Sequence, residues 1–574
     1  MLTRLRIRNF KLFDDVEIHL GNPVVFIGPN NSGKTTALQA LALWSIGLNR
    51  WNEKRKGKTR PEKRPGVAIN RRDLIAVPIP NANLLWRDLH IRDVQRFNGK
   101  QRTQNIRVDM IVDGVDDGIA WTCGLEFDYA NEESFYCRPL RLTEGNDSER
   151  MTVPSQTSHI KVAFLPPMSG LAANETRLDP GAINVRIGEG RTAEVLRNLC
   201  YQLASDETDK KKWGEICEQI DHLFGVRLDE PEYILERGEV TMSYRTREGV
   251  RLDLSASGRG LQQTLLLLTY MTANPQSVLL LDEPDAHLEI LRQRHIYQIL
   301  TDTAQKQQSQ VIAASHSEII LNEAADRDVV VAFLGKPHRI DDRGSQLLKS
   351  LKEIGFDQYY QAEQKGWVLY LEGATDLAIL RAFAEILKHP AQNLLDQPFV
   401  HYVLNQPQKA REHFHGLREA KSDLVGLAIF DRLDRELQTH LMLKEYSLSR
   451  REIENYLCQP QVLLEWAANK GREEFGGPIF GFEWRTTMTE TIASIEEAML
   501  TLGKGSPWSP DTKVTDDFLD PLFAAFFRKL ELPNLMRKTD YHVLAKLVPL
   551  DQLDPEISQL LDLIVETAKK ASPQ

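Results

Sequence analysis

The chain has 574 residues, of which 42% are hydrophobic and 26% charged, and this near-average composition excludes a chain that is disordered overall. Lys plus Arg number 71 and Asp plus Glu 81, so the net charge of −10 excludes a histone-like DNA coat and leaves any nucleic-acid contact to local basic patches. At roughly 100–200 residues per domain, the length predicts about three to five domain-sized pieces, or two large ones.

The expected location follows from segments that the sequence lacks. No apolar stretch approaches about 18 residues, the length that suggests a membrane span, and the first residues lack the apolar core of a signal peptide. The five cysteines are widely spaced and form no Cys-x-x-Cys pair. We therefore expect a cytoplasmic protein with reduced thiols and no membrane contact.

The first half of the chain mixes strands and helices. Alternating apolar residues predict two strands within the first twenty residues, then a buried strand at 24–27, a glycine turn and a helix from about 34 to 48. Residues 50–72 hold ten Lys or Arg against two Glu and predict a loop. This loop is either solvated or a contact for nucleic-acid phosphates, with Trp51 stacking on a base. The other predicted elements are strand-rich segments at 105–128 and 135–164, helices at 192–224, 261–273 and 287–306, and parallel strands at 277–282 and 310–315.

After about residue 345 the pattern starts again as a second, smaller α/β unit. From 485 onward the chain is predicted to be mostly helical, with a Gly/Ser/Pro linker at 503–513. The predicted elements of the smaller unit are strands at 367–371, 399–404 and 424–430 and helices at 375–388 and 408–422.

A phosphate-binding loop is predicted where the strand at 24–27 meets the next helix. The segment Gly28-Pro-Asn-Asn-Ser-Gly33-Lys34-Thr35 fits G-x-x-x-x-G-K-[ST], in which backbone N–H groups cradle phosphates, the lysine reaches the terminal ones and the hydroxyl ligates Mg²⁺. The candidate ATP-binding residues are Asn30, Gly33, Lys34, Thr35 and Thr36.

The matching acidic half of such a site follows the strand at 277–282. Asp282 stands at the strand end, where it can hold Mg²⁺ together with Thr35, and Glu283 can polarise the attacking water. Taken alone, two solvated carboxylates would be the better interpretation; paired with the phosphate-binding loop, the catalytic interpretation is favoured.

These motifs resemble the ABC-type ATPases of the RecF, SMC and OLD (overcoming lysogenization defect) group. Leu5-Arg-Ile-Arg-Asn-Phe-Lys11 is similar to their first strand, and the segment from Leu254 to Gln263 is similar to their signature loop. Asp285 and His287 fall at the position of their D-loop, and His316 looks like their switch histidine, a catalytic candidate beside Glu283.

The resemblance implies a head-to-tail dimer driven by ATP. The signature loop of one subunit would close over nucleotide held by another, so Ser255, Gly258 and Gly260 would bind ATP in trans. A helix cap is the simpler role for Ser255 and Gly258, and both roles are compatible. About 220 residues separate Lys34 from Ser255, which excludes long coiled-coil arms. We expect an ATPase domain over 1–345 with a short helical insertion at 190–230 as a candidate dimerisation element.

A second acidic site is predicted at strand ends of the smaller unit. Glu372 and Asp376 follow one strand, and Asp431 and Asp434 follow another. Because the carboxyl ends of parallel strands meet at one edge of a sheet, these four side chains can converge on Mg²⁺ or Mn²⁺. Ordinary loop acids would explain either pair alone.

Together the two pairs resemble a Toprim domain, the metal-dependent fold of topoisomerases, primases and OLD-family nucleases. Glu372-Gly-x-x-Asp376 matches its first motif, but the second is Asp431-x-x-Asp434 instead of Asp-x-Asp, with Leu433 at the expected aspartate. Either Asp434 or Glu436 could replace that ligand. We expect the Toprim domain over 366–480 and a helical part at 481–574 that completes this half.

The resemblance also extends to an acidic segment and a lysine further along the chain. Glu452 and Glu454 are candidate extra metal ligands, Glu454 the better one, and an acidic helix start is the alternative. Such nucleases use a downstream lysine in the transition state, for which Lys538 is the first candidate and Lys546 the second.

Two histidines further along the smaller unit could form a zinc pair. His413 and His415 have no third ligand nearby in the sequence, so we interpret them as surface histidines.

The order ABC-type ATPase then Toprim resembles the OLD family, whose relatives include Gabija, PARIS and retron-linked antiphage effectors. The resemblance implies an α/β, nucleotide-regulated and metal-dependent endonuclease that cleaves DNA or tRNA, alone or with a second defence component. An ATP-gated sensor or scaffold with an inactive Toprim-like part is the alternative. A RecF-like repair ATPase is the third, and the acidic site argues against it.

Overall fold

The computed structural model describes residues 1–573 except 56–65, 75–76, 78, 98–99, 144–148, 326, 341–353, 435–436, 439–440 and 476. The chain divides into two compact units, Met1–Leu348 and Lys349–Gln574. This division falls between the predicted ATPase region, 1–345, and the predicted second region, which starts at 366. Both units are mixed α/β, as the sequence predicts. In the described part of the chain, no helix is long and apolar enough to cross a membrane.

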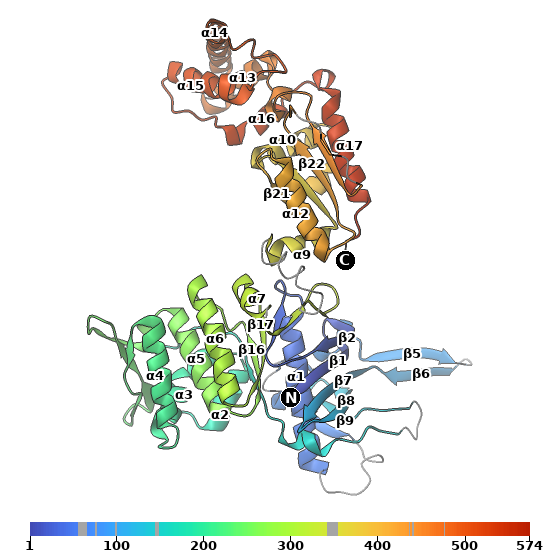
Figure 1. Cartoon of the computed structure of the whole chain (residues 1–574), viewed down its shortest axis with the longest axis vertical. Helices are drawn as coiled ribbons and strands as arrows, with labels where there is room; N and C mark the ends of the chain where they lie inside the picture. The colour runs from blue at the N-terminus through green and yellow to red at the C-terminus, as the bar shows by residue number, and fades with distance from the viewer. Residues whose placement is uncertain are drawn as a thin grey trace. The chain divides into compact units, whose positions relative to one another are not determined.

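The first unit contains two six-stranded sheets (Figure 1). The antiparallel sheet has the order β2-β1-β7-β8-β9-β4, and the other sheet has the order β10-β16-β17-β3-β18-β19, parallel except for β19. The strands of the first sheet are β2 (Phe13–His19), β1 (Leu2–Phe10), β7 (Arg107–Asp116), β8 (Ile119–Asn131), β9 (Ser134–Pro139) and β4 (Val67–Asn70). Those of the second are β10 (Val162–Leu165), β16 (Val278–Asp282), β17 (Gln310–Ser315), β3 (Val24–Ile27), β18 (Val329–Ala332) and β19 (His338–Arg339).

Helix α1 (Lys34–Arg55) packs between these sheets and contacts strands of both. The parallel sheet is buried on both faces, because alternate residues of β16 and β17 face α1 on one side and a layer of helices on the other. The helices of that layer are α2 (Pro180–Gly188), α3 (Leu196–Ser205), α4 (Lys210–Phe224), α5 (Arg259–Ala273) and α6 (Ile290–Lys306). Smaller elements are α7 (Glu318–Ala324), the β5–β6 hairpin (Arg92–Phe97 and Lys100–Asn105), β11 (Arg227–Leu228), β12 (Glu232–Ile234), β13 (Glu239–Thr241), β14 (Ser243–Arg245) and β15 (Arg251–Asp253).

Helix α1 corrects two predictions for residues 50–72. The helix continues past the predicted end at 48 to Arg55, because Trp51 still contributes an apolar side chain to the core and is only 4% exposed. A buried indole cannot stack on a nucleic-acid base, so the proposed role of Trp51 is wrong. Residues 67–70 form β4 instead of loop, and the basic stretch at 56–65 lies outside the described residues.

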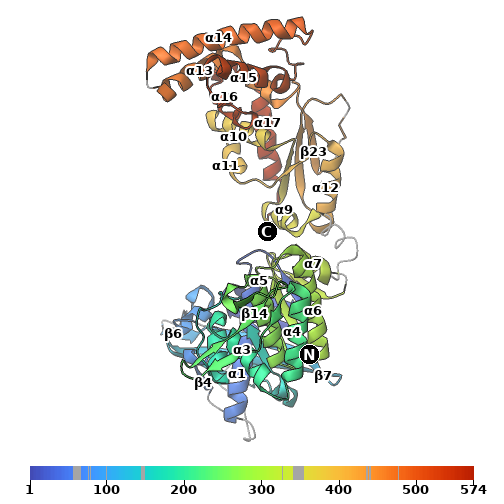
Figure 2. The same cartoon turned by 90° about the vertical axis from the view of Figure 1, so that its left-hand side faces the viewer.

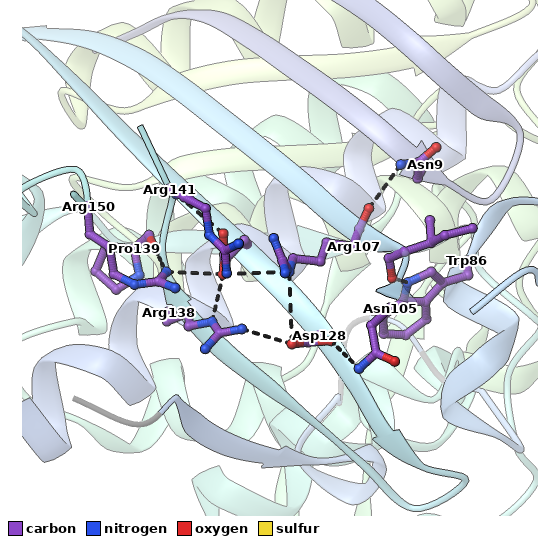
Figure 3. A network of polar contacts seen from close by, with 11 residues as sticks. Asn9, Trp86, Asn105, Arg107, Asp128, Arg138, Pro139, Arg141 and Arg150 are labelled. Carbon is purple, nitrogen blue, oxygen red and sulfur yellow. Dashed lines mark hydrogen bonds and ion pairs between the residues drawn. The ribbon is translucent and has the colours of Figure 1, made fainter. Parts of the chain in front are cut away.

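A charged network covers part of the antiparallel sheet (Figure 3). Its centre is Glu126, which is 1% exposed and accepts hydrogen bonds from Arg138 (2.6 Å) and Arg150 (3.0 Å). Arg107 and Arg141 approach the same carboxylate at 3.9 and 4.0 Å. A buried carboxylate needs such partners because burial without them is costly. These arginines are therefore engaged by the fold itself and do not form a free basic surface.

The second unit is built on a parallel four-stranded sheet with the order β21-β20-β22-β23. Its strands are β21 (Val400–Tyr402), β20 (Trp367–Leu371), β22 (Val425–Phe430) and β23 (Leu443–Ser447), of which β23 is absent from the sequence-based prediction. Helices α12 and α17 both contact β22. The helices include α9 (Phe356–Lys365), α10 (Ala374–Ile386), α11 (Ala391–Asp396), α12 (Pro407–Ala420), α13 (Pro460–Phe475), α14 (Pro478–Thr501), α15 (Asp520–Lys529), α16 (His542–Ala545) and α17 (Pro555–Lys569).

The helical carboxyl-terminal part shares one core with this sheet. Figure 2 shows α14 lying across α13 and α15, and residues of these helices belong to the same apolar cluster as β20 and β22. The predicted linker at 503–513 is packed, which corrects the prediction: the Arg451 N–H donates to the Pro510 carbonyl (2.8 Å), and the Asn455 amide donates to the Thr512 carbonyl (3.0 Å). The glycines and prolines there shape a packed loop.

Candidate functional site

The phosphate-binding loop joins the buried strand β3 to α1. Gly33 has a φ of +104°, and a Cβ at this position would lie 2.8 Å from the Phe13 ring, so the position requires glycine. Helix α1 begins at the next residue, which directs the free N–H groups of its first turn toward the loop. The local structure is therefore that of an anion cradle at a helix start.

Lys34 lies inside this loop. Its amine donates to the carbonyls of Gly28 (2.6 Å) and Pro29 (2.7 Å), and its side chain is buried. Burial lowers the pKa of Lys34, and the carboxylates of Glu283 and Asp282 act in the opposite direction. The lysine therefore faces the acidic residues that follow β16.

Thr35 and Asp282 are brought together from β16 and α1, two segments far apart in the sequence. The Thr35 hydroxyl donates to Asp282, with Oγ1 2.8 Å from Oδ2 and 3.1 Å from Oδ1. Burial raises the pKa of Asp282 to about 6. A hydroxyl and a buried carboxylate are hard oxygen donors, so this pair fits Mg²⁺ beside a bound phosphate. Asn30 and Thr36, the other predicted loop residues, are exposed and half-buried respectively.

Glu283 and His316 lie side by side at the ends of β16 and β17. His316 Nδ1 is 3.7 Å from Glu283 Oε1, and the Glu283 N–H donates to the Ala314 carbonyl (2.8 Å). Glu283 adopts a φ of +49°, a conformation that few non-glycine residues adopt. The adjacent strand thus holds the backbone that aims Glu283, and the two predicted catalytic side chains share one edge of the sheet.

The signature loop precedes α5, and its two glycines, Gly258 and Gly260, differ in their surroundings. Asp253, not Ser255, caps the short 3₁₀ turn at 254–256, since its carboxylate accepts from the Ser255 N–H (2.8 Å). Gly258 is the exposed N-cap of α5, and a Cβ there would meet no atom within 4 Å. At Gly260 a Cβ would lie 3.1 Å from the His287 carbonyl oxygen. Packing within the chain explains Gly260 but not Gly258.

Gly258 therefore permits a test that separates approach by another molecule from stability. We expect Gly258→Ser to keep the melting temperature, because serine is at least as good an N-cap as glycine and its Cβ has open space. ATP hydrolysis should fall by about tenfold or more, because the added side chain occupies the place where a phosphate would approach. Calorimetry measures the melting temperature, and a phosphate-release assay measures ATP hydrolysis. Unchanged hydrolysis would show that nothing comes close to Gly258.

The second site lies at the carboxyl ends of β20 and β22. Glu372 follows β20, and Asp376, in the first turn of α10, accepts from the N–H groups of Glu372 (2.9 Å) and Gly373 (3.3 Å). Burial, together with the Glu372 charge, raises the pKa of Asp376 to about 6. Burial and the charges of Glu372 and Asp376 raise the pKa of Asp431, which follows β22, to about 9. Three predicted ligands, all half-buried, therefore lie within electrostatic reach of one another.

Glu454 is the fourth carboxylate of this group. It lies in a 3₁₀ turn (Ile453–Tyr456), is 3% exposed, and its Oε1 has no hydrogen-bond partner among the described residues. Burial raises its pKa to about 8, with Glu452 and Asp376 adding to the effect. Glu452 itself caps the turn and accepts from the Thr515 N–H. The alternative of an acidic helix start therefore applies to both residues, Glu452 as the N-cap and Glu454 in the first turn, but only Glu454 also contributes to the raised pKa of Asp431.

Two observations bear on the fit of these residues to a divalent cation. Within the described ranges, no three His, Cys, Asp or Glu side chains are already arranged to hold a metal ion. The orphaned Glu454 oxygen and the raised pKa values of Asp376, Asp431 and Glu454 nevertheless identify carboxylates whose negative charge is not fully offset. The all-oxygen chemistry of this donor set fits Mg²⁺ or Mn²⁺.

Asp434 does not join this group. Its side chain is exposed, and the carboxylates that raise the pKa of Asp431 are Glu372, Asp376 and Glu454 instead. The loop after β22 turns away because Ser447 of β23 accepts from the Leu433 N–H (3.0 Å). Asp434 therefore lies outside the carboxylate group, Glu454 lies within electrostatic reach of Asp431, and Glu436 lies outside the described residues.

Two lysines lie within electrostatic reach of the carboxylates. Lys538 is exposed, and its charge partly counteracts the burial that raises the pKa values of Glu452 and Glu454. Lys513 pairs with Asp516 (2.6 Å), and the charges of Glu452 and Glu372 contribute to its raised pKa. Lys546 instead pairs with Glu385 (2.6 Å), away from the group. Lys513 was not predicted from the sequence, because it stands in the Gly/Ser/Pro segment at 503–513 that predicts a linker.

A buried anchor holds the turn that carries Glu454. Glu556, in the first turn of α17, accepts from the hydroxyls of Tyr446 (2.9 Å) and Tyr456 (2.5 Å) and from the Ser449 N–H (3.0 Å). These contacts join β23, the turn and the last helix. About a hundred residues separate Glu556 from its partners, so no local motif could have identified it.

His413 is half-buried and engaged by its neighbours, which corrects the prediction of a surface histidine. Its Nδ1 lies 2.9 Å from the Tyr370 hydroxyl, its Nε2 lies 2.6 Å from Gln358 Oε1, and its ring stacks on His401 at 3.8 Å. Both ring nitrogens are occupied, so His413 cannot form a zinc pair with the exposed His415. Burial, with a smaller effect of His401, lowers the pKa of His413 to about 3.

This shift predicts a pH dependence of stability. Between about pH 6.5 and 3 the unfolded chain binds a proton at His413 that the folded chain does not, so stability falls as the pH falls through this window. We expect His413→Gln to flatten the curve of unfolding free energy by up to about 1.4 kcal/mol per pH unit. Urea unfolding at several pH values measures it, with His415→Gln as the exposed control. A curve parallel to wild type would contradict the prediction.

Comparisons with known proteins support an ATPase in the first unit. Residues 1–59 match the family model "AAA ATPase domain", and residues 215–322 match "AAA domain, putative AbiEii toxin, Type IV TA system". A curated relative, the "OLD nuclease" of Thermus scotoductus (strain ATCC 700910 / SA-01), is 44% identical over 43 residues, which is 8% of this chain and 8% of the relative.

Solved structures of SMC heads also match. The SMC head domain from Thermotoga maritima is 16% identical with a TM-score of 0.31, covering 59% of this chain and 98% of that one. An Smc head domain bound to ScpA derived from Pyrococcus furiosus is 13% identical with a TM-score of 0.33, covering 62% and 99%. These scores are too low to carry a conclusion.

The phosphate-binding loop, the Thr35–Asp282 pair and the two family-model matches define an α/β protein with an ATPase domain. With the partial match to an OLD nuclease, they fit an ATPase of the OLD family.

Proposed function

We propose that the chain is an ATP-hydrolysing, metal-dependent endonuclease of the OLD type that acts in antiphage defence, with the nucleotide state controlling cleavage. The observation that carries the nuclease assignment is the carboxylate group formed by the half-buried Glu372, Asp376 and Asp431 and the buried Glu454. Like charges buried together are costly unless protons or a cation offset them. A bound Mg²⁺ or Mn²⁺ in a nuclease would offset these charges and explain why the four carboxylates lie together.

The residues of this group have separable roles in phosphodiester cleavage. Bound Mg²⁺ or Mn²⁺ would activate water and stabilise the leaving oxygen. Asp376 is held by two backbone N–H groups, so its carboxylate is oriented in advance, while Glu372, Asp431 and Glu454 supply the other oxygens. Lys538, with Lys513 as an alternative, would offset negative charge on the phosphate in the transition state.

The ATPase assignment uses the residues of the first unit. Lys34 would bind the terminal phosphates, Thr35 and Asp282 would hold Mg²⁺, Glu283 would polarise water, and His316 would contact the γ-phosphate. Ser255, Gly258 and Gly260 would come from a second copy of the chain, in a head-to-tail dimer. The exposed Gly258, with open space where a Cβ would be, supports an approach from outside the chain.

The proposed substrates are DNA and, as a second possibility, tRNA, and a second defence component is a candidate partner. A cleavage assay on plasmid DNA and on tRNA, with Mg²⁺ or Mn²⁺ and with or without ATP, tests the proposal. We expect metal-dependent cleavage of one substrate whose rate changes with ATP. Inertness on both substrates, also in the presence of proteins encoded by neighbouring genes, would contradict the nuclease assignment.

An ATP-gated sensor or scaffold is the second candidate. The observation that favours it is that the described carboxylates are not already arranged around a metal position, and that Asp434 points away from them. In that case Mg²⁺ and Mn²⁺ would not raise the melting temperature, and ATP would instead change the binding of a partner.

A further inference from the structure

A buried arginine connects the helical layer of the first unit to the signature loop. Arg197, in the first turn of α3, is 2% exposed. Its guanidinium donates to the Ala172 carbonyl (2.9 Å) and to Asp253 Oδ1 (3.1 Å). Helix α3 lies next to α4 and α5 in the first unit (Figure 1), and α5 is the helix that follows the signature loop.

The start of α3 is itself fixed by a second buried acid. Glu175 is 2% exposed and accepts from the N–H groups of Arg197 (2.9 Å) and Asn198 (2.6 Å). Arg197 Nη1 is also 3.9 Å from Glu175 Oε2, so the buried guanidinium lies between two carboxylates. A buried charge with this many partners has one favourable geometry, because any movement would leave an uncompensated charge.

Asp253 links Arg197 to the serine of the signature loop, Ser255. Its Oδ1 accepts from Arg197 and also from the Ser255 N–H (2.8 Å) and the Ser255 hydroxyl (2.6 Å). Arg197 therefore holds the carboxylate that holds Ser255. When a phosphate approaches, the Ser255 hydroxyl can turn to it as the new acceptor, while the N–H bond to Asp253 keeps the loop in place.

We propose that Arg197 and Asp253 are positioning residues for Ser255, and that they make ATP turnover depend on the position of α3. This inference rests on the proposed ATPase function and deepens it. It assigns the helical layer a control role: a partner that displaces the start of α3 would move Asp253 and, with it, the serine that faces the γ-phosphate. Neither residue would touch nucleotide, so both act on hydrolysis without forming the phosphate-binding loop.

The test compares Arg197→Gln, Asp253→Ala and Asp253→Asn in the full-length chain. We expect the first two to lower kcat for ATP hydrolysis by about tenfold or more, a change that corresponds to loss of about one hydrogen bond to a charged group. Binding of a fluorescent ATP analogue should stay within about twofold of wild type. Asp253→Asn should recover part of kcat, because its amide oxygen can still accept from the Ser255 N–H.

Asp229→Ala is the matched control. Asp229 also pairs with arginines, at 3.1 Å from Arg245 and 3.0 Å from Arg251, beside the same small sheet, but it has no bond to Ser255. The kcat of Asp229→Ala should equal that of wild type.

The outcomes separate this inference from the proposed function. If kcat of Asp253→Ala equals that of wild type, or falls only as far as that of Asp229→Ala, the positioning role is wrong while the ATPase assignment stands. If Arg197→Gln fails to fold, Asp253→Ala decides, because the Asp253 side chain is half exposed. A wild-type chain that neither binds nor hydrolyses ATP overturns the proposed function and this inference with it.

Discussion

Glu372→Ala is expected to lower metal-dependent cleavage of nucleic acid by at least about a hundredfold. Glu372 follows β20 and contributes to the raised pKa values of both Asp376 and Asp431, so its carboxylate lies among the proposed ligands. Metal ions supply several kcal/mol of transition-state stabilisation, and each 1.36 kcal/mol is tenfold in rate. Initial rates on the substrate that wild type cleaves, with Mg²⁺ and with Mn²⁺, measure the effect.

The matched control for this prediction is Asp434→Ala. Asp434 belongs to the same predicted motif, but its side chain is exposed and outside the carboxylate group. We expect this variant to keep wild-type cleavage. If Asp434→Ala lost activity and Glu372→Ala kept it, the placement of the metal site would be wrong.

Thermal unfolding gives a second readout that does not depend on finding the substrate. A ligand at about 100 times its Kd stabilises the folded state by about 2.7 kcal/mol. We therefore expect wild type to melt at a higher temperature in Mn²⁺ than in chelator. The increase should be smaller for Glu372→Ala, because this variant loses the proposed metal site of the second unit. An equal rise in both proteins would place the metal elsewhere.

The sequence predicted best where chemistry depends on strand ends. Thr35 and Asp282 are separated by about 250 residues, yet a motif at a helix start and an acid at a buried strand end suffice to predict that they meet, since parallel strands end at one edge. The same rule brings Glu372 and Asp431 together. The α/β class follows from the same alternation of buried strands and helices and is confirmed by the structure.

Prediction from the sequence failed for residues whose position depends on the path of a loop. The Asp431-x-x-Asp434 spacing left the second ligand open between Asp434 and Glu436, whereas the structure has Asp434 exposed and Glu454 within electrostatic reach of Asp431. Composition suggested a linker around Lys513, although the carbonyl of the preceding residue, Thr512, accepts from Asn455 in the turn that carries Glu454. No local pattern marks Arg197, because its partners Glu175 and Asp253 lie far away in the sequence.

Glu283→Gln is expected to stop ATP hydrolysis while keeping ATP binding. A general base contributes about 10²–10⁴-fold to a rate, and glutamine removes the base while preserving the shape of the side chain. The Glu283 backbone is held by the Ala314 carbonyl, so the substitution leaves the strained conformation supported. Phosphate release should fall by about a hundredfold or more, and a fluorescent ATP analogue should bind as tightly as it binds wild type.

The stalled variant also tests the proposed dimer. If the signature loop of one copy closes over nucleotide on another, then Glu283→Gln with ATP should accumulate as a dimer in sedimentation, whereas Lys34→Ala should stay in its nucleotide-free oligomeric state. Glu289→Gln is the control, because Glu289 is an exposed carboxylate on the same segment. Hydrolysis by Glu283→Gln at the wild-type rate would remove Glu283 from the mechanism. If Glu283→Gln does not hydrolyse ATP and its mass does not change with ATP, the catalytic role of Glu283 stands but the trans arrangement is wrong. Ser255 would then have to act within its own chain.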